Sequence, residues 1–228
     1  MPNNKEKVAL FDFCETIANF QTADEYVNYT RNYYGNLKMK IWSLLHLLAA
    51  RFQIISLLEY FYPKASINKR FIARQLSNEP LEKLDKAARE YYQNIIRPNL
   101  IHTVISEVMR LKKEGYRVML ISGGYNIYLR YFAKEFDIED TDVIATRLRF
   151  SNGKCTGSFE GKDCLFEEKT SRLNLLFPNK DNYYFLAYSD SESDRPMLDW
   201  ADQGVVIRKK GAPKWDLNNQ YKELLWEK

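Results

Sequence analysis

Short apolar runs alternate with helical patterns over the second half of this 228-residue chain, and this alternation limits the fold more than any other feature. Strands that are separated by helices are joined by right-handed crossovers and run parallel in one sheet. We therefore expect an α/β fold with a doubly wound parallel sheet. Strands are predicted at 116–122, 143–150, 183–188 and 204–208, with helices at 125–136, 166–177 and 195–200.

One predicted strand stands apart from the others, near the start of the chain. The run VALF at 8–11 is short and apolar, as is typical of a strand buried in a parallel sheet. From about residue 20 to about residue 105 the pattern is helical and aromatic, with no convincing strand. We interpret residues 1–19 and 106–228 as the α/β core, and residues 20–105 as an inserted α-helical cap domain.

Composition indicates a globular protein and a broad class of partners. A hydrophobic content of 45% suits a sizeable core, and the net charge of +4 permits anionic small molecules, anionic lipid or nucleic acid without selecting among them. Cys14, Cys155 and Cys164 are too few and too scattered for a disulfide framework or a zinc site. Because we interpret them as free thiols and find no secretory signal, we expect a cytoplasmic protein, at most peripheral to the inner face of the membrane.

Polar residues follow several of the predicted strands. Ligands of open parallel sheets bind beyond the carboxyl ends of the strands, so these residues are expected to converge on one crevice. Clustered carboxylates favour a divalent cation, and oxygen ligands favour Mg²⁺. A hydroxyl, exposed backbone N–H groups and a lysine suit a phosphoryl group, which a free carboxylate could attack. The residues concerned are Asp12, Ser122, Gly123, Lys169, Asp190 and Asp194.

Four segments in a fixed order resemble a known family. DFCET, ISGGY, EEKTSRL and YSDSESD are similar to the four motifs of the haloacid dehalogenase superfamily, which are mostly phosphatases, and especially to its phosphoserine-phosphatase-like branch. The resemblance implies a Rossmann-like core with a helical cap. It also implies a Mg²⁺-dependent phosphomonoester hydrolase that works through an aspartyl-phosphate.

The resemblance assigns a nucleophile and a metal site. Asp12 corresponds to the nucleophile and a Mg²⁺ ligand, and the backbone carbonyl of Cys14 to a second ligand. Asp190 corresponds to a direct ligand, with Asp194 ligating the metal or bracing it. Read without the family, Asp12 is a turn residue after a strand, and Asp194 is an N-cap for the helix that begins near residue 195.

The resemblance also assigns the residues around the substrate phosphate. Ser122 and the N–H of Gly123 correspond to phosphate ligands, and Lys169 orients Asp12 and offsets charge. Thr16 corresponds to the residue that ties down the loop after the first strand, beside the substrate. The alternative for Lys169 is an ordinary solvated helix residue in the charged stretch EEKTSR.

Cys14 departs from the family pattern, in which an aspartate protonates the leaving group and then activates water. A thiol has an ordinary pKa of about 8.5, and neighbouring carboxylates would raise it further, so Cys14 is expected to stay neutral. A positioned acid–base group contributes about 10²–10⁴ in rate. Three consequences are possible without an aspartate at position 14. The substrate has a good leaving group, another residue such as Glu15 acts as the acid and base, or turnover is slow. The alternative for Cys14 itself is that it only fills space. The alternatives for the whole protein are a phosphate-binding regulatory protein and a phosphotransferase.

Two features bear on the substrate. Gln21 stands where phosphoserine phosphatases of the family carry a glutamate that meets the substrate amine, which argues against phosphoserine. The apolar run at 40–62 is interrupted by polar residues and is a poor transmembrane span. It predicts the core of the cap, an apolar wall for a lipid-like phosphate, or a membrane-surface contact.

The run YSDSESDRPML and this apolar segment resemble bacterial phosphatases of the same branch that act on phosphatidylglycerophosphate. A small-molecule or lipid-like phosphate is therefore expected. Nucleic acid is not favoured, because tyrosines at helical spacing are more often core or interface. The oligomeric state is not indicated.

Overall fold

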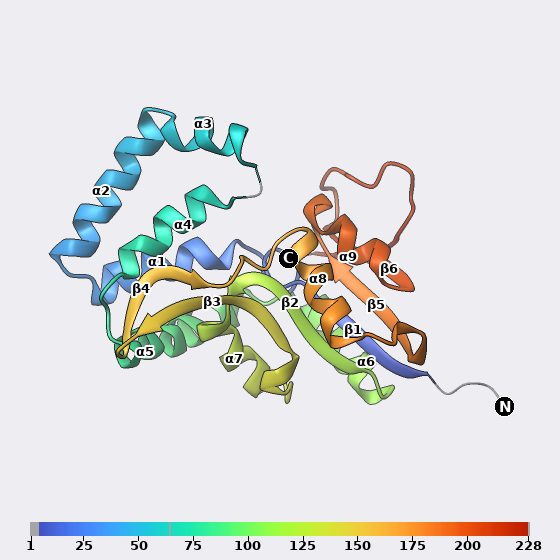
Figure 1. Cartoon of the computed structure of the whole chain (residues 1–228). Coiled ribbons are helices and arrows are strands. Elements are labelled where there is room, and N and C mark those ends of the chain that lie inside the picture. Colours follow the sequence, from blue (N-terminus) through green and yellow to red (C-terminus); the bar gives the residue numbers. More distant parts are fainter. Residues whose placement is uncertain (1–4, 64, 228) are drawn as a thin grey trace.

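A seven-stranded sheet forms the centre of the computed structural model, which describes residues 5–63 and 65–227 (Figure 1). The strand order is β4-β3-β2-β1-β5-β6-β7, and every neighbouring pair is parallel except β3 and β4. The strands are β1 (Glu6–Phe11), β2 (Arg117–Tyr125), β3 (Val143–Ser151), β4 (Lys154–Glu160), β5 (Tyr183–Ser189), β6 (Gln203–Lys209) and β7 (Lys222–Trp226).

Alternate residues of each central strand enter one of two cores, because successive side chains point to opposite faces of a sheet. Ala9 and Phe11 pack with α6 (His102–Lys113) and α7 (Asn126–Glu135) on one face. Val8 and Leu10 pack with α8 (Glu167–Leu176) and α9 (Arg195–Trp200) on the other. Helices on both faces of a mostly parallel sheet confirm the predicted doubly wound α/β class.

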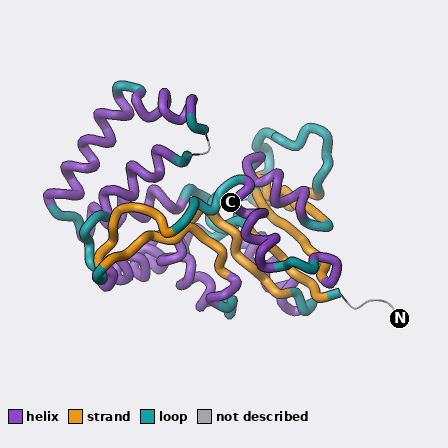
Figure 2. The backbone as a smooth tube through the Cα atoms, in the orientation of Figure 1, coloured by secondary structure: helices purple, strands orange, loops and turns teal. Residues whose placement is uncertain are grey.

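In the described chain, the insertion between β1 and α6 is formed mainly by the helices α1 to α5 (Figures 1 and 2). The ends of this insertion meet, since Ile101 donates its backbone N–H to the carbonyl of Ile17 at 2.8 Å and Asn19 donates to Asn99 at 3.0 Å. Helices α2, α3 and α4 project away from the sheet. The helices are α1 (Thr22–Tyr34), α2 (Leu37–Arg51), α3 (Ile54–Phe61), α4 (Ile67–Ala73) and α5 (Leu81–Tyr91), with the short helices η1 (Arg74–Leu76), η2 (Tyr92–Ile96) and η3 (Arg97–Asn99).

One of the proposed domain limits falls within a helix. The limit at 105/106 falls inside α6, whose buried residues Val104, Val108 and Leu111 belong to the core beneath the sheet. The helical insertion therefore ends before His102, where α6 begins. Residues 1–4 and 228 of the proposed core lie outside the described residues.

Two strands were not predicted from the sequence. β4 forms a hairpin with β3 through Asn152 and Gly153, both at positive φ. Asn-Gly between two strands is a strong hairpin signal, because a type I′ turn needs positive φ at both positions. β7 extends the sheet beside β6, and with β4 it makes the sheet mixed and wider than expected.

The edge of β4 is covered by the insertion. Asn78 donates its backbone N–H to the carbonyl of Cys155 at 2.7 Å, Cys155 donates to Glu79 at 2.9 Å, and Leu81 donates to Gly153 at 2.9 Å. These main-chain bonds fasten the segment between η1 and α5 to the hairpin. They also satisfy groups that an open edge strand would expose.

The prediction that the run at 40–62 fills the core of the cap is wrong. Met39 and Ile55 are the buried residues of α2 and α3, whereas most of their leucines and isoleucines are exposed. The apolar core of the insertion comes instead from α1 and α5 and the helix α7 beneath them.

A cluster of four buried tyrosines joins the insertion to the α/β core. The ring of Tyr26 on α1 lies 5.6 Å from that of Tyr91 on α5, 6.1 Å from that of Tyr125 and 5.4 Å from that of Tyr128. Its hydroxyl donates to the carbonyl of Leu84 at 2.9 Å. Aromatic contacts at these distances stabilise a fold beyond the area they bury.

Replacing Tyr26 tests this junction. Tyr26→Ala is expected to lower the free energy of unfolding by about 3–5 kcal/mol, because it leaves a cavity among three rings. Tyr26→Phe loses only the hydroxyl contact and is expected to cost about 1 kcal/mol. Urea unfolding measures both, with Tyr60→Ala as the control because Tyr60 is 80% exposed. Equal costs for the two Tyr26 variants would show that its ring does not join the two parts.

Candidate active site

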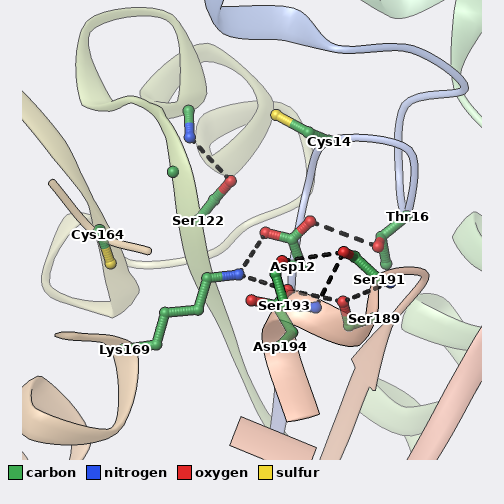
Figure 3. A network of polar contacts seen from close by, with 12 residues as sticks. Asp12, Cys14, Thr16, Ser122, Cys164, Lys169, Ser189, Ser191, Ser193 and Asp194 are labelled. Carbon is green, nitrogen blue, oxygen red and sulfur yellow. Dashed lines mark hydrogen bonds and ion pairs between the residues drawn. The ribbon is translucent and has the colours of Figure 1, made fainter. Parts of the chain in front are cut away.

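A cavity of about 300 Å³ opens at the carboxyl ends of β1, β2 and β5. These strands lie near the middle of the sheet, where ligands of open α/β sheets bind. Most of the residues predicted from the strand ends meet here (Figure 3). The lining residues are Asp12, Cys14, Gln21, Ala23, Asp24, Lys69, Gly123, Leu165, Lys169, Asp190, Ser191, Ser193 and Asp194.

Lys169 bridges two carboxylates at the base of the cavity. Its Nζ donates to Oδ1 of Asp12 at 2.8 Å and to Oδ2 of Asp194 at 2.6 Å. Only 1% of the Lys169 side chain is exposed, so it is not the solvated helix residue of the alternative interpretation. Burial opposes the charged ammonium, but the attraction of both carboxylates outweighs it and raises the pKa of Lys169.

Thr16 lies on the other side of the Asp12 carboxylate from Lys169 (Figure 3). Its hydroxyl lies 3.4 Å from Oδ2 of Asp12 and 2.8 Å from Oδ1 of Asp190, and it accepts from the backbone N–H of Asp190 at 3.0 Å. These contacts join the loop after β1 to the loop after β5. Thr16 is fully buried and does not line the cavity.

The charges of Asp12 and Asp190 are incompletely compensated in the described structure. Burial, followed by the charge of Asp12, raises the pKa of Asp190 to about 7. Burial also raises the pKa of Asp12, although Lys169 acts against the increase. A further positive charge in the cavity would therefore be stabilised.

The donor set fits Mg²⁺. Asp12 and Asp190 supply two carboxylates close to one hydroxyl, and the resemblance adds the carbonyl of Cys14. Among the described residues, no cluster of three or more histidine, cysteine or acidic side chains could hold a metal by itself. Mg²⁺ does not need such a cage, because it is usually bound by one or two carboxylates, waters and substrate phosphates.

Asp194 is held by two donors beside these carboxylates. Its Oδ2 accepts from Lys169 and, at 2.7 Å, from the hydroxyl of Ser189, while Oδ1 is buried with no hydrogen-bond partner in the described part of the chain. Asp194 occupies the N-cap position of α9, but its side chain makes no cap hydrogen bond. The N-cap interpretation therefore does not account for its side chain.

Ser122 and Gly123 occupy different places in the site. Gly123 lines the cavity, and a Cβ there would lie 2.4 Å from a side-chain carbon of Leu165. Ser122 is fully buried behind it and accepts from the backbone N–H of Gly124 at 3.1 Å. The structure thus places Ser122 where it shapes the glycine turn and does not line the cavity.

Cys14 is half-buried at the cavity wall. Its Sγ lies 3.0 Å from the hydroxyl of Thr22, which lies 2.7 Å from the hydroxyl of Tyr128. Burial, and then the charge of Asp12, raises the pKa of the Cys14 thiol to about 11. The thiol is therefore neutral near pH 7, as the sequence predicted, but burial contributes more than the neighbouring carboxylate.

Glu15 and Gln21 interact with each other. Gln21 lines the cavity, and its amide donates to the carboxylate of Glu15. Glu15 has a positive φ of 57° and does not line the cavity. The structure gives Glu15 no contact that would let it replace Cys14 as an acid.

A second lysine was missed by the sequence analysis. Lys69 on α4 donates from Nζ to Oδ1 of Asp163 at 2.5 Å and to the carbonyl of Gly123, and it lies 5.3 Å from the centre of the Tyr125 ring. It brings a cation from the insertion to the cavity wall. No motif marks Lys69, and Asp163 follows β4, the strand that was not predicted.

Comparisons with known proteins find a family and several relatives. The chain matches the haloacid dehalogenase-like hydrolase family over residues 9–199. Human phosphoserine phosphatase is 29% identical over 158 residues, which is 63% of this chain and 69% of that protein. The histidinol-phosphatase of Neisseria meningitidis serogroup C (strain 8013) is 27% identical over 165 residues, 69% of this chain and 71% of that protein.

The fold is also found among solved structures. A protein of unknown function from Bordetella pertussis Tohama I superposes with a TM-score of 0.76 over 97% of this chain and 99% of its own, at 19% identity. At this identity the likeness shows a shared fold.

Removing the bridging lysine tests the electrostatics of the site. Lys169→Met is expected to lower the free energy of unfolding by about 3–5 kcal/mol, because it leaves two buried carboxylates without their cation. Adding Asp194→Asn to that variant is expected to recover part of the loss. Urea unfolding measures all variants, with Lys162→Met as the control because the Lys162 side chain is 83% exposed. If the losses of unfolding free energy in the two single variants simply add in the double variant, Lys169 does not compensate the charge of Asp194.

Proposed function

We propose a function from one premise, that this chain belongs to the haloacid dehalogenase-like hydrolase family. Family membership and the two phosphatase relatives support hydrolysis of phosphomonoesters. The function we propose is a Mg²⁺-dependent phosphatase that forms an aspartyl-phosphate on Asp12. The observation that carries it is the buried Lys169 bound to Asp12 and Asp194 at the base of the cavity, because it presents a fixed carboxylate to that space.

The two oxygens of Asp12 are not equivalent. Oδ1 accepts from Lys169 at 2.8 Å, whereas Oδ2 has only the 3.4 Å contact with Thr16, whose shorter bond is to Asp190. Oδ2 therefore lies on the side of Asp190, where the proposed metal ion would be held, and Oδ1, held by Lys169, is the proposed nucleophile. As its bond to phosphorus forms, the bond between phosphorus and the leaving oxygen breaks with its electron pair. Water then attacks the phosphorus, which frees Asp12 and releases inorganic phosphate.

The surrounding groups offset the charge of the phosphoryl group. Lys169 stays protonated beside Asp12, and the backbone at Gly123 lies open to the cavity. When bound, a Mg²⁺ ion held by Asp12, Asp190 and the carbonyl of Cys14 would supply the remaining positive charge. Fixed positive groups at a site of developing charge account for most catalysis of this kind.

Proton transfer to the leaving oxygen is the weak step in this site. The neutral Cys14 thiol, with its pKa of about 11, is a poor base and a weak donor. Its contacts lead through Thr22 to Tyr128, and burial raises the pKa of Tyr128 well above its ordinary value. We therefore propose that the enzyme favours substrates whose leaving oxygen needs little help from an acid.

The proposed substrate is a small-molecule phosphate or a lipid-like phosphate whose head group enters the cavity. A volume of about 300 Å³ accommodates a phosphoryl group with a small leaving group. The relatives act, by name, on phosphoserine and histidinol phosphate. Gln21, held by Glu15, stands where the resemblance expects a glutamate for a substrate amine, so phosphoserine is not our proposal. We also retain two predictions from the sequence. Residues 40–62 contact a membrane surface, and the protein is cytoplasmic.

A second candidate is a phosphate-binding regulatory protein or a phosphotransferase on the same fold. The observation that favours it is the neutral, hydrogen-bonded thiol of Cys14, which leaves the water step without its usual base. Measuring the hydrolysis of aryl and alkyl phosphates distinguishes the phosphatase from these alternatives. A folded protein that binds Mg²⁺ and phosphate but hydrolyses neither aryl nor alkyl phosphates would support binding or transfer.

Asp12→Asn tests the nucleophile. It is expected to abolish Mg²⁺-dependent hydrolysis of an activated aryl phosphate, because an amide oxygen cannot form the covalent intermediate. The measurement compares the variant and the parent with Mg²⁺ and with chelator, and circular dichroism checks the fold. Asp181→Asn is the control, since Asp181 lies in η5 (Lys180–Asn182), which precedes β5 at the opposite end of that strand. Hydrolysis that survives in Asp12→Asn would falsify the assignment.

Cys14→Asp tests the missing acid. The new carboxylate would lie beside the Thr22 hydroxyl, and hydrolysis of alkyl phosphates is expected to rise by about tenfold or more. Aryl phosphates, which leave readily, are expected to gain less. The ratio of kcat/KM for the two substrate classes in Cys14→Asp and in the parent measures the effect. A fall for both classes would mean that the thiol contributes to turnover in another way.

A further inference from the structure

Two apolar stripes of the insertion face solvent. On α2, Ile41, Leu44, Leu45 and Leu48 follow the spacing of one helix face, and between 43% and 57% of each is exposed. On α3, Ile54, Leu57, Leu58 and Phe61 repeat the same spacing with exposures of 40% to 65%. A soluble domain usually turns such stripes toward its core.

The inner sides of the two helices are already used. Trp42 packs edge-on against Phe71 of α4 at 6.0 Å between ring centres, and Nε2 of His46 lies 2.8 Å from Oδ1 of Asn68. Glu59 of α3 accepts from the backbone N–H of the same Asn68 at 3.0 Å. The apolar stripes are therefore the outer faces, with no partner in the described part of the chain.

The charges beside the stripes are of one sign. Lys38, Lys40 and Arg51 are exposed. Glu59 is the only acidic residue among residues 37–62, and it is half-buried against α4. An apolar face flanked by exposed cations, with no exposed acid, is complementary to an anionic lipid surface.

The shape of this region indicates a surface contact and not a crossing. In the described chain no single helix is long and apolar enough to span a membrane, although α2 and α3 pass that test together as a pair bent by 71°. The 15 residues of α2 extend about 22 Å at 1.5 Å per residue, less than a hydrocarbon core of about 30 Å.

We propose that the outer faces of α2 and α3 dock on the surface of an anionic lipid bilayer, with their leucine stripes in the acyl boundary and Lys38, Lys40 and Arg51 among the head groups. The inference does not depend on phosphatase activity. A second copy of this chain is a poorer occupant, because its cations would face those of the first without acids to pair them.

The helices that carry the stripes also hold the segment that reaches the cavity. Asn68 is held by both α2 and α3, and its neighbour Lys69 reaches the cavity wall at Asp163.

Vesicle sedimentation of the full chain tests the proposal. Vesicles of phosphatidylcholine mixed with phosphatidylglycerol are expected to bind the protein more strongly than phosphatidylcholine alone, and added salt is expected to weaken the binding. Leu44→Ser with Leu57→Ser is expected to reduce partitioning by at least about tenfold. Leu175→Ser with Leu217→Ser is the matched control, since these leucines are 83% and 80% exposed outside the insertion.

Three results would overturn the proposal. The first is equal binding by the two double variants, which would exclude the stripes. The second is equal binding to both vesicle types, which would exclude recognition of anionic lipid. The third is a dimer in sedimentation velocity that the Leu44 and Leu57 changes abolish, with no binding to vesicles, which would make a second copy the occupant. Circular dichroism confirms that each variant is folded.

Discussion

One buried ammonium holds the reacting edge of the sheet together. Lys169 comes from α8, whereas Asp12 and Asp194 come from the loops after β1 and β5, and all three meet at hydrogen-bond distance. Burying charges costs several kcal/mol per ion, and the cost is offset only when each charge has a close partner. Asp12 is therefore fixed before any substrate arrives, which is the preorganisation that electrostatic catalysis requires.

The strand-end residues could be predicted from sequence because chain order and sheet topology dictate their meeting. Parallel strands that are adjacent in the sheet end at the same edge, so Asp12 and Asp190 had to approach one another. Local pattern also predicted the core helices α7, α8 and α9, but not α6. Ser122 shows the limit of this reasoning, since the direction of its hydroxyl depends on the conformation of the glycine turn.

The rest of the site depends on contacts between segments with no local signature. Lys69 reaches the cavity from the insertion, and Asp163 follows β4, which the sequence analysis overlooked. The Asn-Gly pair at 152–153 could have revealed that hairpin. The exposure of the 40–62 run was equally hidden, because its apolar spacing is the same whether the stripe faces a core or solvent.

The hairpin of β3 and β4 also restricts how the insertion can move. Asn78, Glu79 and Leu81 are hydrogen-bonded through their backbones to this hairpin, and the entry and exit of the insertion are paired at residues 17–19 and 99–101. A rigid swing of the whole insertion would have to break these bonds together. The insertion is therefore anchored at its entry and exit and along the β3–β4 hairpin, and the ion pair of Lys69 with Asp163 also ties α4 to the cavity wall, so the position of α4 limits how widely the cavity opens on that side.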